Sequence, residues 1–147
     1  MKAIARSAIV EHAAAEMYAL VDDIEAYPRF LPWCLEARAQ QSGARKRATL
    51  TVGLGGIRQT FTTENQSQPG RAIDMRLVEG PFRQFSAAWR FTPLGEHACQ
   101  IDFSMRYQFA SRALAKLLEP LFNQIADTMV DAFTRRADEP QGRRAAP

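Results

Sequence analysis

The chain has 147 residues, of which 46% are hydrophobic and 24% charged, a balance typical of one globular domain. This composition excludes wholesale disorder, a collagen-like repeat and a disulfide-stapled miniprotein. The net charge is only +3, and part of it comes from four arginines that follow Thr134, so the total charge does not indicate a general polyanion-binding protein.

The N-terminal part predicts one strand followed by two short helices. Lys2–Val10 reads as a strand, and Ala13–Val21 carries apolar residues at helical spacing. A short helical turn is expected over Asp23–Ala26. We expect Tyr27 and Pro28 to stop it, because the residue before proline avoids the α region.

The middle of the chain alternates apolar and polar residues, which is the period of a strand. A strand is expected over Leu35–Gln41, and the alternation then continues from Thr49 to Phe109, most regularly over Cys99–Phe109. One apolar face and one polar face indicate an antiparallel meander that is covered on one side. Short turns are predicted at Gly55-Gly56, Pro69-Gly70, Gly80-Pro81 and Leu94-Gly95.

Large apolar residues recur at helical spacing between Leu114 and Phe133. Pro120 falls inside this pattern, and proline lacks a backbone N–H and crowds the carbonyl of Lys116. We therefore expect a short helix that ends near Glu119 and a long helix with Pro120 in its first turn. Residues 1–138 are predicted to form a single domain, and residues 139–147 a disordered tail.

This order of elements predicts an α+β fold, in which a curved antiparallel sheet of about six to seven strands wraps around the long C-terminal helix. A curved sheet and a straight helix cannot touch along their full length. The space between them is either filled by large side chains or left as a ligand cavity. Both interpretations are open, because the inward set is unusually aromatic and includes Phe61, Phe85, Trp89, Phe91, Phe103, Tyr107 and Phe109.

The segment Tyr27–Cys34 holds two prolines and three aromatic residues within eight positions. Proline restricts the backbone, so this segment is predicted to be a stiff loop that carries bulky apolar groups. Three interpretations are open for it: the mouth of a cavity, a lip that touches a membrane, and a loop folded onto the core.

The compartment is predicted from what the sequence lacks. No apolar run of about 18 residues is present, so no membrane-spanning helix is expected. Glu11 comes too early for a secretion signal, and Cys34 and Cys99 match no metal motif and are expected to be reduced thiols. We expect a cytoplasmic protein, with peripheral contact at the inner face of the membrane as the alternative.

Short motifs occur in a fixed order along the chain, at Val21, Tyr27, Phe30–Cys34, Phe61–Thr63, Leu77–Phe82, Trp89–Leu94 and Met129–Phe133. Together they resemble the coenzyme Q-binding START family, and the similarity extends from Lys2 to Arg136. The resemblance implies a START-like helix-grip fold, shared with polyketide cyclase-like domains, and a cavity for a long apolar molecule such as ubiquinone. The same family includes bacterial ribosome association toxins.

The resemblance makes quinone binding the leading hypothesis. The protein would hold ubiquinone or a similar polyprenyl quinone in support of respiratory electron transport, without catalysis, a metal or another required cofactor. We expect Arg83 or Tyr107 to donate a hydrogen bond to a quinone carbonyl, and an ion pair between Glu79 and Arg83 at the rim of the cavity is the competing role for Arg83. The expected ligand-binding residues are Tyr27, Phe30, Leu31, Pro32, Trp33, Phe61, Leu77, Phe82, Arg83, Trp89, Phe91, Phe103, Tyr107, Phe122 and Met129.

The first alternative is a toxin-like protein that binds the large ribosomal subunit and blocks subunit association. It would use outward-facing arginines, because the planar guanidinium suits phosphates and stacked bases. Acidic residues share that face, so cross-strand ion pairs are the competing explanation. The residues concerned are Arg58, Arg76, Arg90 and Arg106, with Glu64, Asp74 and Asp102 beside them.

The second alternative is a polyketide cyclase or dehydratase. Acid–base catalysis needs a titratable group within reach of the substrate. The two histidines, His12 and His97, are expected at the surface and outside the cavity, and the inward polar candidates are Tyr107, Gln59 and Thr63. No combination of nucleophile, base and orienting group can be assembled from these residues.

Overall fold

The computed structural model describes residues 1–139. Within them the chain forms an antiparallel sheet, two α-helices and one 3₁₀-helix. The elements are β1 (Lys2–Val10), α1 (Ala14–Asp22), η1 (Ile24–Arg29), β2 (Cys34–Ser42), β3 (Arg45–Leu54), β4 (Ile57–Gln68), β5 (Ala72–Glu79), β6 (Phe82–Gly95), β7 (Ala98–Phe109) and α2 (Arg112–Asp138). The predicted tail beyond Glu139 lies outside the described residues.

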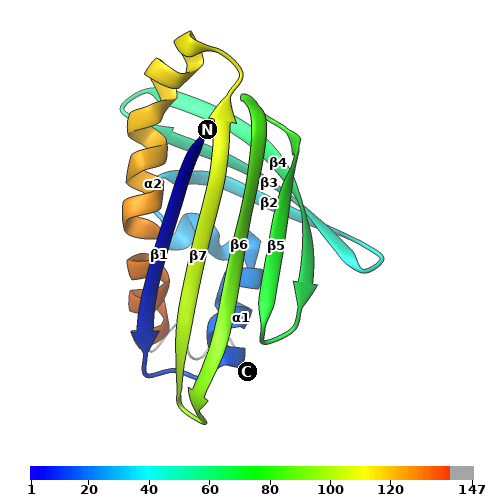
Figure 1. Cartoon of the computed structure of the whole chain (residues 1–147), viewed down its shortest axis with the longest axis vertical. Helices are drawn as coiled ribbons and strands as arrows, with labels where there is room; N and C mark the ends of the chain where they lie inside the picture. The colour runs from blue at the N-terminus through cyan, green and yellow to red at the C-terminus, as the bar shows by residue number, and fades with distance from the viewer. Residues whose placement is uncertain (140–147) are drawn as a thin grey trace.

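The sheet has seven strands in the order β1-β7-β6-β5-β4-β3-β2, and every neighbouring pair is antiparallel. It curves strongly, so that β2, β3 and β4 pass behind β5 and β6 in Figure 1, while α2 runs beside β1. The predicted α+β fold, with a curved sheet around a long C-terminal helix, is confirmed. The meander is longer than predicted, since β3 begins at Arg45 and its first residues are too polar to show the strand period.

The β3–β4 turn shows how local sequence sets the strand register. Leu54 pairs with Ile57, which leaves Gly55 and Gly56 as a two-residue turn with φ of 58° and 88°. Positive φ at both positions matches the twist of a hairpin and favours glycine. This turn was predicted, and it places all of β4 in register with β3.

Pro120 does not divide the C-terminal helix as predicted. Helix α2 runs without interruption from Arg112 to Asp138, with Pro120 inside it. Proline has no N–H, so the carbonyl of Lys116 lacks its usual donor within the helix. Lys116 and Glu119 are both exposed, so water can bind to this carbonyl. Burial of the apolar face of α2 on both sides of Pro120 then outweighs the cost of the missing helical hydrogen bond.

Pro28 does not stop the second helix either, because η1 continues through it to Arg29. Hydrogen bonds that span Pro28 hold this turn together. The carbonyl of Tyr27 accepts from the backbone N–H of Phe30 at 3.2 Å and from that of Leu31 at 2.9 Å. The Tyr27 hydroxyl donates to the carbonyl of Val21. Tertiary packing of the buried Tyr27 ring therefore outweighs the preference of a residue before proline for extended backbone.

The core lies between the concave face of the sheet and α2. Phe122 of α2 contacts the rings of Phe61 and Phe82, with centroids 6.0 and 5.2 Å apart. Further along α2, Phe133 contacts the rings of Tyr27 and Trp89, each at 5.4 Å. These contacts join α2 both to the sheet and to the segment after α1.

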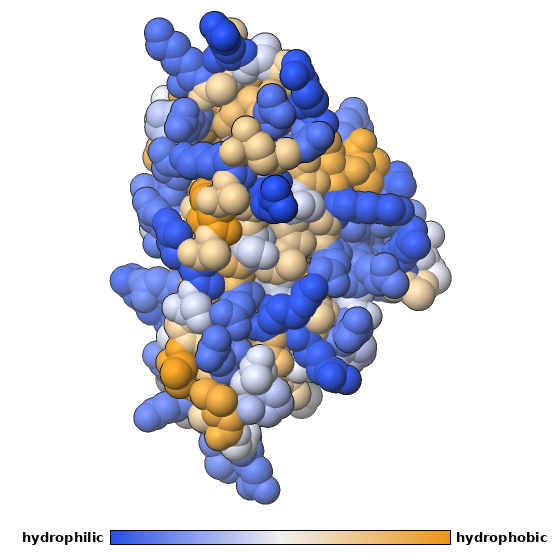
Figure 2. Space-filling model, in the orientation of Figure 1, coloured by the Kyte–Doolittle hydropathy of each residue, from blue (hydrophilic) through white to orange (hydrophobic). Residues whose placement is uncertain are grey.

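The convex face of the sheet is polar and largely self-paired. On the part that faces the viewer in Figure 2, hydrophilic side chains surround moderately hydrophobic ones, and strongly hydrophobic side chains form separate spots. Three of the four arginines singled out from the sequence form cross-strand ion pairs: Arg58 with Glu36 at 3.3 Å, Arg76 with Glu64 at 3.3 Å and Arg90 with Asp74 at 2.8 Å. Arg45 also reaches Glu64, at 3.3 Å. The competing explanation, ion pairing, is confirmed for these three.

Among residues 1–139, no helix combines the length and the apolar character needed to cross a membrane.

Phe133→Ala is expected to destabilise the fold by about 3–5 kcal/mol, because it removes a fully buried ring that holds η1 and Trp89 against α2. Chemical denaturation measures the change. Leu117→Ala on the same helix is the control, because Leu117 is 48% exposed and its loss should cost less than about 0.5 kcal/mol. Equal effects of the two substitutions would contradict the packing described here.

Hydrogen bonds from Arg45 and Arg76 lower the pKa of the Glu64 carboxyl below its ordinary value of 4.5. A carboxyl whose pKa is lowered by folding stabilises the folded state above its unfolded pKa, and this contribution is lost as pH falls through the folded pKa. We expect Glu64→Gln to lower the free energy of unfolding at pH 7 and to have little effect in strong acid. Denaturation at both pH values tests this, and a difference that persists in acid would contradict it.

Candidate functional site

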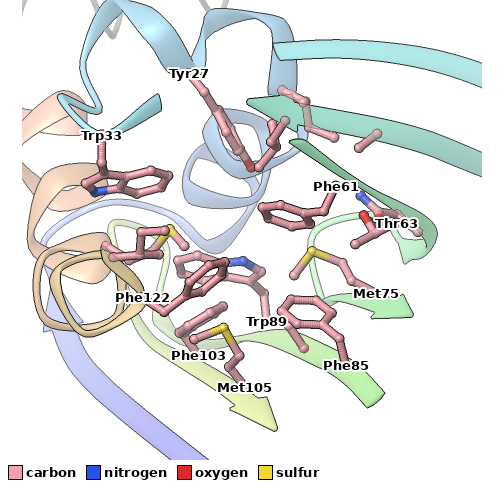
Figure 3. A pocket seen from close by; sticks show the side chains of 17 residues that line it. Tyr27, Trp33, Phe61, Thr63, Met75, Phe85, Trp89, Phe103, Met105 and Phe122 are labelled. Atoms are coloured by element: carbon pink, nitrogen blue, oxygen red, sulfur yellow. Dashed lines mark hydrogen bonds between the residues drawn. The ribbon is translucent and has the colours of Figure 1, made fainter. Parts of the chain in front are cut away.

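A pocket lies between the sheet and α2, with a volume of about 60 Å³. Figure 3 shows aromatic and methionine side chains converging on it from the strands and from α2. Its lining is almost entirely apolar and contains no charged side chain: Ile24, Tyr27, Trp33, Ala48, Leu50, Phe61, Thr63, Asn65, Met75, Phe85, Ala87, Trp89, Phe103, Met105, Phe122, Ile125 and Met129.

The volume limits what the cavity holds in this conformation. A cavity of about 150 Å³ is known to admit a benzene ring, and about 30 Å³ corresponds to one water molecule. A quinone ring therefore requires the lining to move apart. Three of the lining residues are methionines, Met75, Met105 and Met129, and their unbranched side chains repack at low cost.

Two polar side chains meet in the lining on consecutive inward positions of β4. The hydroxyl of Thr63 donates to Oδ1 of Asn65 at 2.8 Å, and both residues are at least 95% buried. Figure 3 shows Thr63 at one end of the cavity, beside Met75. Thr63 was among the inward polar candidates from the sequence, whereas Asn65 was missed. The strand period that places Phe61 and Thr63 inward also places Asn65 there.

The other hydrogen-bonding groups near the cavity are mostly used within the protein. Tyr27 donates to Val21, and burial, assisted by the negative charge of Asp22, raises the pKa of its hydroxyl, so the phenol stays neutral. Nε1 of Trp33 donates to the hydroxyl of Thr128 at 3.1 Å. The lining therefore offers neither a histidine nor a carboxylate for acid–base chemistry.

Of the fifteen residues predicted to bind ligand, seven line the cavity: Tyr27, Trp33, Phe61, Trp89, Phe103, Phe122 and Met129. The other eight do not: Phe30, Leu31, Pro32, Leu77, Phe82, Arg83, Phe91 and Tyr107. The segment from Tyr27 to Cys34 is folded onto the core, with Leu31 1% and Trp33 3% exposed. The burial of Leu31 and Trp33 agrees with the third interpretation of this segment, a loop folded onto the core.

The two predicted partners of a quinone carbonyl lie away from the cavity. Arg83 is exposed near the start of β6. Tyr107 is buried among the rings of Phe82, Phe109 and Phe122, and its hydroxyl has no hydrogen-bond partner in the part of the chain that the structure describes. Burial, assisted by the charge of Glu119, raises the pKa of Tyr107 to about 12.

His12 is not at the surface as predicted. Its ring is 9% exposed and lies between two carboxylates, with Nδ1 2.8 Å from Glu16 and Nε2 2.6 Å from Asp138. The end of α2 packs over it, which the local sequence does not reveal. Both His12 and the exposed His97 lie outside the cavity lining.

Four exposed arginines on the strands form no ion pair with any residue in 1–139: Arg38, Arg47, Arg83 and Arg106. Two of them, Arg38 and Arg47, lie side by side on β2 and β3, where Gln40 pairs with Arg47 and Arg38 pairs with Thr49. These four paired residues line one shallow groove, with Glu25 at its rim. The hairpin that carries them projects from one side of the molecule (Figure 1). We call this the hairpin groove.

Two relatives match nearly the whole of this chain. It is 42% identical over 143 residues to the ribosome association toxin RatA of Vibrio cholerae, with 97% of this chain and 99% of that protein covered. It is 28% identical over 148 residues to the mitochondrial coenzyme Q-binding protein COQ10 homolog B of Xenopus laevis, covering 96% of this chain and 60% of that protein.

A solved structure shares the fold at low sequence identity. The ZhuI aromatase/cyclase from Streptomyces sp. R1128 superposes with a TM-score of 0.81 at 17% identity, over 93% of both chains. The family model for polyketide cyclase/dehydrase and lipid transport matches residues 10–134. Together with the fold, these matches show that the chain belongs to the polyketide cyclase/dehydrase and lipid transport family of START-like proteins.

Proposed function

We propose that this protein acts on ribosome association by binding the large ribosomal subunit, without catalysis. The observation that carries this proposal is the 42% identity to a ribosome association toxin over nearly the whole of both chains. Identity at this level over such a length makes a shared partner the simplest expectation. The leading hypothesis from the sequence, quinone binding, becomes the second candidate.

The hairpin groove is the surface that fits ribosomal RNA best. Arg38 and Arg47 have no ion pair within residues 1–139, so a phosphate would not have to displace an internal carboxylate. Arg58, Arg76 and Arg90 already pair with acids, and binding RNA through them would break those pairs. Arg38 and Arg47 are exposed, and the hairpin that carries them projects from one side of the molecule, where a large partner could contact it (Figure 1).

We expect the double variant Arg38→Gln/Arg47→Gln to bind purified large ribosomal subunits about tenfold or more weakly in co-sedimentation. The salt dependence of binding should also fall, by about one in slope for each phosphate that the variant no longer neutralises. Arg58→Gln/Arg90→Gln is the matched control, because it removes the same charge from arginines that are already paired.

Equal weakening by the two double variants would mean that net charge, and not the hairpin groove, drives binding. If the wild-type protein does not sediment with the large subunit at low salt, the proposed function itself is wrong.

The second candidate function is binding of an apolar ligand, such as a polyprenyl quinone, for respiratory electron transport. The apolar lining of the cavity favours it, as does the 28% identity to a coenzyme Q-binding protein. Because the cavity is about 60 Å³, the head of such a ligand would enter only as the methionine side chains repack, and a long tail would lie outside. A cyclase is less well supported, since the lining has no acid or base with an accessible proton.

Methionine methyl NMR tests this second function. On addition of a short-chain quinone, we expect the methyl signals of Met75, Met105 and Met129 to shift, because these side chains line the cavity. Met17 is the internal control, as it is fully buried in α1 and lies outside the lining. Shifts at Met17 alone, or none, would contradict quinone binding in this cavity.

A further inference from the structure

The hairpin groove contains an acidic side chain that its arginines do not pair with. Glu25 of η1 lines the groove together with Arg38 and Arg47, and all three side chains are exposed. None of the three forms an ion pair with any residue in 1–139. Arg45, by contrast, pairs with Glu64 on the next strand at 3.3 Å. The groove therefore presents one carboxylate and two guanidinium groups that have no ion-pair partner among the described residues.

A backbone group holds the Glu25 carboxylate at the rim of the groove. β2 is an edge strand of the sheet, and η1 packs against it. The backbone N–H of Ala39 donates a long hydrogen bond to Oε2 of Glu25, at 3.4 Å. The other oxygen, Oε1, forms no hydrogen bond within residues 1–139. An ionised carboxylate offers about four lone-pair sites, so most of the accepting capacity of Glu25 is unused.

The two arginines lie diagonally across β2 and β3. Arg38 pairs with Thr49 and Gln40 pairs with Arg47, so these four side chains share one face of the hairpin. Diagonal neighbours of this kind are about 7–8 Å apart. The groove has a volume of about 420 Å³, which is in the range of pockets that hold small molecules. It can therefore hold more than one functional group of a ligand at the same time.

A phosphate by itself does not match all three charges. The two guanidinium groups attract it through charge-assisted hydrogen bonds, but the carboxylate of Glu25 has no proton to donate and repels an anion. A ligand that matches the groove carries a phosphate for the arginines and a hydrogen-bond donor for the carboxylate. In RNA every phosphate is joined to a ribose whose 2′-hydroxyl is such a donor, and DNA lacks this group.

We propose that Glu25 recognises the ribose of RNA in the hairpin groove. Its carboxylate accepts a hydrogen bond from a 2′-hydroxyl, while neighbouring phosphates bind Arg38 and Arg47. This inference rests on the first proposed function, binding of the large ribosomal subunit, and it adds a specificity-determining residue. The 2′-hydroxyl is the same in every nucleotide, so the groove distinguishes RNA from DNA and does not select a base sequence.

The test measures fluorescence anisotropy with three labelled single-stranded oligonucleotides of one sequence: RNA, its 2′-deoxy form and its 2′-O-methyl form. The 2′-deoxy form lacks the hydroxyl, and the 2′-O-methyl form keeps the oxygen but has no proton to donate. The test variant is Glu25→Ala. Glu96→Ala is the matched control, because Glu96 is an exposed glutamate in the β6–β7 turn that also forms no ion pair within residues 1–139.

We expect the wild-type protein to bind the RNA about tenfold more tightly than either modified form, as a hydrogen bond to a charged group allows. Glu25→Ala should reduce this preference to about twofold or less. General electrostatics predicts a different result, because both variants raise the net positive charge equally and should tighten binding of all three oligonucleotides alike. Glu96→Ala should keep the preference. The melting temperature of Glu25→Ala should stay close to that of the wild type, because Glu25 is exposed.

A Glu25→Ala variant that keeps the preference for RNA would overturn this inference, as would an equal loss of preference in Glu96→Ala. A wild-type protein that binds the RNA and 2′-deoxy forms equally, or binds no oligonucleotide, would also overturn it. In each of these cases, co-sedimentation of the wild-type protein with the large ribosomal subunit would leave the proposed function in place. If the wild-type protein neither prefers RNA nor sediments with the subunit, both proposals are wrong.

Discussion

Packing of the apolar face of α2 against the concave face of the sheet holds the fold together. It is made by two aromatic groups separated along the helix. Phe122 joins the rings of β4, β6 and β7, and Phe133 joins Tyr27, Phe30 and Trp89. Between them α2 presents Ile125 and Met129, which line the cavity. On α2, the cavity is therefore lined by Phe122 together with the smaller or more flexible side chains that follow it.

The alternation of strand residues separates two chemical environments. Inward positions carry the rings and the buried Thr63 and Asn65, and outward positions carry the arginines and their acidic partners. The cavity and the hairpin groove share no residue, so an apolar ligand inside and an RNA contact outside do not compete for the same groups. A family that includes both a ribosome association toxin and a coenzyme Q-binding protein is compatible with such a division.

Ion pairing reduces the number of arginines on the convex face that are available to bind another molecule. The number of outward arginines suggests a broad basic face, but Arg45, Arg58, Arg76 and Arg90 form ion pairs with carboxylates on other strands. Each surface pair contributes little stability by itself. An ion pair has a larger effect on phosphate binding, because an arginine that is already paired must break that pair to bind a phosphate.

The fold class, the inward-facing set of aromatic residues and the glycine turns can be predicted from the sequence alone, because each depends on a period or a preference that acts over a few neighbouring residues. Other features depend on tertiary packing. Pro120 and Pro28 remain inside helices because burial of Phe122 and Tyr27 outweighs a local cost. Within residues 1–139, Arg58 forms an ion pair and Arg38 forms none, because of where the carboxylates lie on other strands. Asn65 shares the inward period with Thr63, but its burial in the cavity lining depends on the elements packed around the cavity, which no local pattern records.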